Sequence, residues 1–169
     1  MKAALPFVVA VLAAGCASFD GRALQPGRST AAEVEAVMGL AADKRPAAGG
    51  ETVYYFPRLP WGYATYAARI APDGTLVALE QRLTPENTGR VRSGVTRAGE
   101  VRDLLGPPFQ PVKAPLSGND LWTYPMRVPG DPTPKWFLVQ LSPDGVVRET
   151  YLINDPHWDQ PDSPRRSLR

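Results

Sequence analysis

Few side chains of this chain are suited to catalysis or metal binding. Its 169 residues include one histidine, His157, and one cysteine, Cys16. A metal site needs several ligands at matched spacing, and a nucleophile needs a base beside it. Asp73 and Asp144 occupy turn sequences, where aspartate stabilises the turn itself. Gly-x-Ser-x-Gly, phosphate-binding and Ser-x-x-Lys motifs are absent. We therefore expect no enzyme, no metal site and no cofactor, although a carboxylate pair built from distant loops stays open.

Cys16 suggests a different chemistry, acylation. An apolar run from Ala3 to Leu12 precedes it, followed by Ala13-Ala14-Gly15. This run is too short to span a bilayer, so residues 1–15 are predicted to be a signal peptide. The small residues before a lone cysteine resemble a lipobox, where bacterial lipoproteins are cleaved and acylated. The alternative is an ordinary secretory signal followed by an unpaired thiol. We expect lipidation, because a leftover thiol in an exported protein needs an explanation.

The resemblance to a lipobox implies a membrane anchor. Three acyl chains on Cys16 would hold the protein permanently, with residues 16–26 as a lipidated tether. Ala17 follows the cysteine, in place of the aspartate that retains lipoproteins at the inner membrane of enteric bacteria. The implied location is the periplasmic face of the outer membrane of a Gram-negative bacterium. A near-balance of 19 basic and 17 acidic residues argues against nucleic acid as a partner.

The main element that positions the remaining residues is a repeated helix. Residues 27–39 and 94–106 share the pattern Gly-x-[Ser/Thr]-x-x-x-Glu-Val-x-x-[Val/Leu]-x-Gly, 67 residues apart. Apolar residues recur at helical spacing in both copies. Hydroxyl residues are expected to begin the helices and glycines with positive φ to end them. The candidate caps are Ser29 or Thr30 (the latter in a capping box with Glu33) and Thr96 at the starts, and Gly39 and Gly106 at the ends.

Each helix is followed by an aromatic strand and then a hairpin. Thr52–Phe56 and Leu121–Pro125 have strand composition, and both hairpins turn at Pro-Asp-Gly, with Gly74 and Gly145 supplying positive φ. The segments 41–51 and 109–120 are interpreted as loops. The predicted fold is α+β, with two tandem lobes of a helix plus a three-stranded antiparallel sheet. The expected boundaries are 27–84 for the first repeat, 92–154 for the second and 155–169 for a flexible tail. The tail is either solvated or uses its arginines to touch anionic lipid or an acidic partner.

These motifs together resemble the SmpA/OmlA, or BamE-like, family of outer-membrane lipoproteins. The resemblance implies two tandem BamE-like domains and an envelope protein partner, such as the barrel assembly machinery of the outer membrane. A paired helix-plus-sheet unit is also similar to the secreted β-lactamase inhibitory proteins, whose sheet face grips an enzyme loop. The matching residues are Gly94-Val95-Thr96, Glu100-Val101, Leu104 to Pro108, Trp122-Thr123-Tyr124, Pro143-Asp144-Gly145, and in the first copy Gly27, Ser29, Glu33-Val34, Gly39, Tyr55 and Pro72-Asp73-Gly74.

Aromatic residues are dense in both strand sets. Tyr54 and Tyr55 must point to opposite faces of a strand, so both belong to a core only if both faces are covered. Most aromatics are expected in the core, and Trp61 and Tyr63 are the first candidates for an exposed binding face. The first functional hypothesis is a protein-binding or scaffold lipoprotein of envelope assembly. The second is an envelope enzyme inhibitor or ligand-binding lipoprotein that uses its sheet face.

Overall fold

A computed structural model describes residues 21–59, 62–113 and 118–158 of the chain. Cys16, Trp61 and residues 159–169 lie outside this range. The described residues form short helices and eight strands, which follow one another in two similar series. In chain order the elements are α1 (Ala31–Met38), β1 (Asp43–Pro46), η1 (Ala48–Gly50), β2 (Thr52–Pro57), β3 (Thr65–Ile70), β4 (Leu76–Gln81), α2 (Pro85–Thr88), α3 (Ala98–Leu105), β5 (Phe109–Lys113), β6 (Asp120–Met126), β7 (Lys135–Leu141) and β8 (Val147–Asn154).

The strands form two antiparallel sheets, in the orders β1-β2-β3-β4 and β5-β6-β7-β8. We call α1 with the first sheet lobe 1, and α2 and α3 with the second sheet lobe 2. The predicted α+β fold with two tandem helix-plus-sheet lobes is therefore confirmed. Both Pro-Asp-Gly hairpins are also confirmed, since they join β3 to β4 and β7 to β8.

Each sheet has four strands, so the prediction of three was wrong. The additional strands β1 and β5 lie in segments that we interpreted as loops. Both segments contain a proline, Pro46 or Pro111, which is unusual in a strand. Proline is tolerated here because β1 and β5 are edge strands, paired on one side only, so the missing N–H removes no hydrogen bond that the sheet needs. The strand β5 also contains a register shift between Phe109 and Val112, and Gln110 has a φ of 50° there.

The starts of the two helices differ in detail. In lobe 1 the predicted capping box is confirmed: Thr30 accepts from the Glu33 N–H, and the Glu33 carboxylate accepts from the Thr30 N–H at 2.7 Å. In lobe 2 the cap is Arg97 and not Thr96, because the helix begins one residue later than predicted. Glu100 then accepts from the Arg97 N–H at 2.7 Å, and the Thr96 hydroxyl accepts from the Arg92 N–H.

The same backbone hydrogen bonds tie each helix to its hairpin. The Gly27 N–H donates to Leu76 and the Gly94 N–H donates to Val147, at 2.8 and 2.7 Å. Similarly, the first residue of each helix donates to the turn glycine, from Ala31 to Gly74 and from Ala98 to Gly145, at 2.8 Å in both lobes. The repeat in the sequence is therefore a repeat in the structure.

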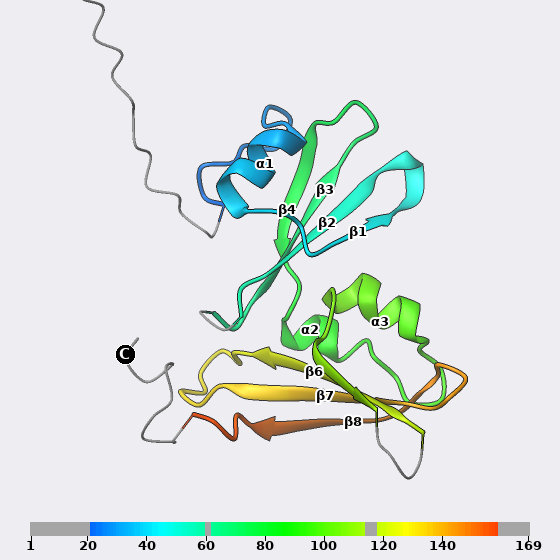
Figure 1. The fold of residues 1–169 in the computed structure, drawn as a ribbon. Helices are drawn as coiled ribbons and strands as arrows, with labels where there is room; N and C mark the ends of the chain where they lie inside the picture. Colours follow the sequence, from blue (N-terminus) through cyan, green and yellow to red (C-terminus); the bar gives the residue numbers. More distant parts are fainter. Residues whose placement is uncertain (1–20, 60–61, 114–117, 159–169) are drawn as a thin grey trace, which may run out of the picture.

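The two lobes stack so that helices and sheets alternate (Figure 1). Val34 and Met38 of α1 are buried on the first sheet, and Val101 and Leu105 of α3 are buried on the second. The other side of α3 faces lobe 1, so the order of layers is α1, first sheet, α3, second sheet. No helix within the described ranges is long and apolar enough to cross a membrane.

The connection between the lobes is more structured than the sequence suggests. The polar segment between the two predicted repeats contains one turn of helix, α2, with Thr84 accepting from the Asn87 N–H and Pro85 at its first position. Leu83 and Val91, on either side of α2, are buried in the core of lobe 2. The connection thus belongs to the second core.

Candidate functional site

The residues singled out from the sequence are scattered in the fold. Cys16 and Trp61 lie outside the described residues. Tyr63 lies between the lobes, where its hydroxyl donates to the Asp155 carboxylate at 2.8 Å and its ring meets the edge of Trp158. The guanidinium of Arg127 lies 5.2 Å from the centres of both rings. The structure therefore places Tyr63 in a contact between lobe 1 and the C-terminal part of lobe 2.

The glycines of the repeated motifs all have positive φ. Gly39 and Gly106 end the helices with φ of 84° and 85° and with ψ near 180°, a region that is almost restricted to glycine. This differs from the left-handed helical conformation that we expected, although it also requires positive φ. The remaining four are Gly27, Gly74, Gly94 and Gly145, with φ between 72° and 85°.

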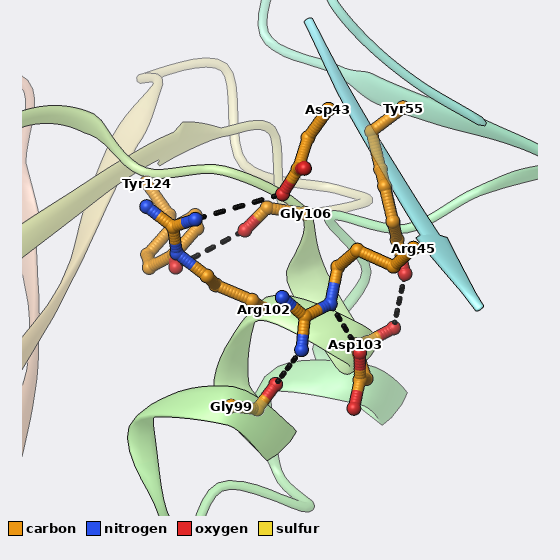
Figure 2. A network of polar contacts seen from close by, with 8 residues as sticks. All are labelled: Asp43, Arg45, Tyr55, Gly99, Arg102, Asp103, Gly106 and Tyr124. Atoms are coloured by element: carbon orange, nitrogen blue, oxygen red, sulfur yellow. Dashed lines mark hydrogen bonds and ion pairs between the residues drawn. The ribbon is translucent and has the colours of Figure 1, made fainter. Parts of the chain in front are cut away.

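The two lobes meet in a network of polar contacts around α3 (Figure 2). The Tyr55 hydroxyl donates to the Asp103 carbonyl at 2.9 Å, and the Arg45 guanidinium contacts the Asp103 carboxylate at 2.6 Å. A looser ion pair joins Arg102 to Asp43 at 3.6 Å. Because Arg45, Tyr55 and Asp43 belong to lobe 1, these bonds fix α3 against the first sheet.

The pKa values of the junction residues are shifted in the directions that their surroundings impose. The hydrogen bond to Asp103 raises the pKa of Arg45 above its usual range. Burial raises the pKa of Tyr55, and stronger burial raises that of Tyr124, whose hydroxyl donates to the Gly106 carbonyl at 3.3 Å. Both tyrosines therefore stay neutral hydrogen-bond donors at neutral pH.

Gly106 also allows the lobes to approach closely. A Cβ atom at this position would lie 2.8 Å from Cγ2 of Thr65 and 2.9 Å from Cδ1 of Tyr55. At Gly39, the corresponding position of lobe 1, a Cβ atom would meet nothing within 4 Å. The end of α3 is therefore packed against another sheet, whereas the space beside Gly39 at the end of α1 is empty within the described residues.

Both faces of the first sheet are covered, so Tyr54 and Tyr55 both have packing partners. Tyr54 lies on the side of α1 and packs against its core, with Lys44 4.1 Å from the ring centre. Tyr55, on the opposite side, is buried beneath the end of α3. Two neighbouring residues of a strand can both be buried only if both faces of the sheet are covered. Here α1 covers one face and the second lobe covers the other.

One face of the second sheet is covered by no described helix or strand, and the C-terminal segment reaches it only at Trp136, whose ring lies 5.4 Å from the ring of His157. Figure 1 shows α2 and α3 on one side of this sheet only. We call the opposite side the outer face. The strand register brings Leu138 beside Tyr151 and Trp136 beside Ile153, and Tyr151 and Ile153 are 45% and 42% exposed. The apolar residues of the outer face are Val112, Leu121, Trp136, Leu138, Tyr151 and Ile153, and the polar residues Thr123, Gln140 and Glu149 share this side.

The outer face is more apolar than the corresponding face of the first sheet. The Pro-Asp-Gly turns align Ala67 with Leu138 and Thr65 with Trp136, and the strand pairings then align Glu80 with Tyr151 and Arg82 with Ile153. At these four positions the covered face thus carries small and charged residues, and the outer face carries large apolar ones. In a chain without a partner, large apolar side chains are expected on the covered face and polar ones on the exposed face. The outer face is therefore the strongest candidate for a binding surface.

Sequence reasoning named a sheet face as a possible binding surface but did not identify the outer face of the second sheet, although two signals pointed to it. Phe137, Val139 and Leu141 alternate with Trp136 and Leu138, so β7 is apolar on both sides. In the last strand, Tyr151-Leu152-Ile153 is a run of three apolar residues, and all three are exposed. Recognising the surface required the knowledge that α3 covers only one side.

The first residues of the predicted flexible tail are packed. Asp155 and Trp158 are buried, the Asp155 N–H donates to the Pro134 carbonyl, and the His157 ring lies 5.4 Å from the ring of Trp136. The prediction of a flexible tail from residue 155 was therefore wrong for residues 155–158. Among the described residues, no group of three histidine, cysteine or acidic side chains could hold a metal ion.

Comparisons with known proteins give no family. The chain matches no protein-family model and no curated protein. Among solved structures it is similar to a DUF4309 family protein (YjgB) from Bacillus subtilis, at 16% identity and a TM-score of 0.30, over 79% of this chain and 84% of that one. The two chains superpose too poorly for this likeness to inform fold or function.

The expected membership of the SmpA/OmlA family was wrong, since no model of any family matches. The motifs behind it are helix caps and Pro-Asp-Gly turns. Such residues are required wherever a short helix ends or a hairpin turns, so unrelated chains acquire them independently.

Proposed function

We propose that this protein is an outer-membrane lipoprotein of the periplasmic side that binds a protein through its outer face, as a scaffold component of the cell envelope. The observation that carries the proposal is the outer face itself, which holds several large apolar side chains and is covered by no described helix or strand. The anchor is supported by Cys16, which follows an apolar leader and small residues.

The composition of this surface suits a protein partner. Tyrosine and tryptophan are enriched among the residues that supply most of the binding energy in protein interfaces, because each buries a large area with few rotatable bonds. Here Trp136 and Tyr151 flank Leu138 in neighbouring strands. A broad sheet surface of this kind offers more contact to another protein than to a small molecule.

A second candidate function is inhibition of an envelope enzyme through the same face. The aromatic pair Trp136 and Tyr151 favours it, since two amphipathic rings beside an apolar centre can hold a loop inserted by an enzyme. This alternative differs from the first in the identity of the partner and leaves the binding surface unchanged.

The proposal is tested by photo-crosslinking in intact cells. A photo-reactive amino acid at Tyr151 is expected to give a crosslinked product, and the same amino acid at Glu86, exposed on α2, is expected to give none. Ile153→Glu should abolish the product, because a charge on the outer face must be desolvated on binding. Equal crosslinking from both positions would contradict the proposed binding surface.

The anchor is tested separately with Cys16→Ser. We expect this variant to leave the membrane fraction after a high-salt wash, while the wild-type chain stays with it. A Cys16→Ser chain that remains in the washed membranes would show that the protein is not held by acylation at this residue.

A further inference from the structure

We propose that the protein bound at the outer face is a second copy of this chain, docked through α1. The two copies would join head to tail, repeating between molecules the contact that α3 makes with the first sheet within one molecule. This inference rests on the proposed function, because it names the partner of the same surface.

The contact within the chain provides the template. The side of α3 opposite its buried residues carries Gly99, Asp103 and, at its end, Gly106. These three lie on lobe 1: Asp103 contacts Arg45 and Tyr55, Gly99 accepts from Arg45 at 3.5 Å, and Gly106 approaches Thr65 and Tyr55 (Figure 2). A helix with small residues on one side thus packs flat on a sheet.

The helix α1 presents the same side without a partner in the described residues. The 67-residue repeat aligns Gly99 with Ala32, Asp103 with Ala36 and Gly106 with Gly39. All three positions in α1 are exposed, and Leu40, directly after the helix, is 87% exposed. Two alanines, a glycine and a leucine form an apolar strip that a sheet can cover.

The outer face carries residues that complement this strip. The strand pairings align Arg45 with Val112, which is 55% exposed. In the proposed contact between copies, Val112 stands where the template has Arg45, and Ala36 stands where it has Asp103. Both charges of the ion pair are therefore replaced, and neither is left unpaired. A single replacement would have left a charge without its partner.

The space around Gly39 also fits the larger side chains of the outer face. At Gly106 the template places Thr65, and the corresponding residue of lobe 2 is the much larger Trp136. Nothing lies within 4 Å of a Cβ atom at Gly39, so an indole ring of another copy has room there.

The geometry of the molecule permits repetition. The free side of α1 and the outer face lie at opposite ends of the stack of layers (Figure 1). An interface between two different surfaces leaves one of each unoccupied on every dimer, so it extends into a chain or closes into a ring. Assembly of this kind continues the alternation of helix and sheet that each copy already contains.

The test uses the purified full-length lipoprotein in detergent micelles and sedimentation velocity over a range of protein concentrations. The wild-type chain is expected to form species larger than the monomer. Ala36→Asp and Val112→Arg are each expected to weaken association at least about tenfold, because each places an unpaired charge in the interface. Ser93→Asp, in an exposed loop, is the matched control and should change nothing.

The double variant with both substitutions is the decisive sample. It rebuilds between copies the ion pair that Arg45 and Asp103 form within one copy, so association should return to within about threefold of wild type. Circular dichroism and thermal unfolding first establish that each single variant is folded like the wild-type chain. Rescue in the double variant then cannot come from restored folding.

The other outcomes overturn the inference. A monomeric wild-type chain at every concentration excludes the second copy as partner. Loss of association with Val112→Arg but not with Ala36→Asp shows that outer faces pair with each other. Neither result removes the proposed function, which fails if the photo-reactive residue at position 151 captures no protein in cells or captures no more than the one at position 86.

Discussion

The hydroxyl of Tyr55 donates a 2.9 Å hydrogen bond to the carbonyl oxygen of Asp103, from the sheet of one lobe to the helix of the other. Within a helix, this carbonyl would accept from the residue four positions later, which is Pro107 and has no N–H. The Tyr55 hydroxyl therefore replaces the backbone N–H that Pro107 lacks. The end of α3 is completed by lobe 1, which explains why the lobes fit together in one arrangement.

Tyr55→Phe is expected to lower the free energy of unfolding by about 1 kcal/mol, because the Asp103 carbonyl is then left without this donor. The measurement is the urea midpoint followed by circular dichroism. Tyr66→Phe is the matched control, since its hydroxyl has no hydrogen bond to any described residue, and it should cost less than about 0.5 kcal/mol. Equal losses in both variants would argue against a bond across the junction.

Gly106→Ala is expected to destabilise the protein more than Gly39→Ala by about 1–3 kcal/mol. Both glycines have the same φ within a degree, so the backbone strain of an alanine is shared. Only at Gly106 does the added Cβ collide with Tyr55 and Thr65 of the other lobe. The difference in urea midpoint therefore measures the close approach of the lobes, and identical midpoints would show that the lobes are not packed this tightly in solution.

Stability is expected to fall in acid. The bond from Lys44 lowers the pKa of Glu35, that from Lys135 lowers the pKa of Asp131, and the Thr75 N–H lowers the pKa of Asp73. A carboxyl whose pKa is lower in the folded chain stabilises it above the ordinary value of about 4, and this contribution is lost as the pH falls through the lowered value. The urea midpoint should be level from about pH 7 to 5 and decrease below about pH 4.

Glu35→Gln tests the assignment, because it removes one of these groups. The acid-induced decrease of the urea midpoint should become smaller in this variant. The pKa of Glu86, on α2 in the other lobe, is also lowered, so Glu86→Gln should reduce the decrease as well. A midpoint that rises on acidification would show that the net effect of these carboxyls has the opposite sign.

The fold could be predicted largely because its signals are local. The capping box of Thr30 and Glu33 and the two Pro-Asp-Gly turns act through residues a few positions apart, so the sequence displays them directly. The edge strands β1 and β5 could not be found in this way. Their identity depends on pairing with β2 and β6, which a run such as Asp43–Pro46 does not reveal.

The candidate site could not be predicted because it depends on which side of the second sheet the helices leave exposed. Alternation in β7 shows that both sides are apolar, but it does not show that α3 occupies only the side of Phe137 and Val139. Likewise, Tyr63 was chosen for its type, and its bond to Asp155 joins residues 92 positions apart. Contacts over such distances in the chain are properties of the fold alone.

Trp158→Ala is expected to lower the free energy of unfolding by about 3 kcal/mol, although the residue lies in the segment predicted to be a flexible tail. Its side chain is 8% exposed and packs beside Tyr63 and Arg127, so its removal leaves a cavity between the C-terminal segment and lobe 1. His157→Ala, at the exposed neighbouring position, removes only the ring contact with Trp136 and should lower the urea midpoint much less. If both variants unfold at the wild-type midpoint, this segment is not held against the lobes in solution, and the contact of Tyr63 with Asp155 contributes nothing to their arrangement.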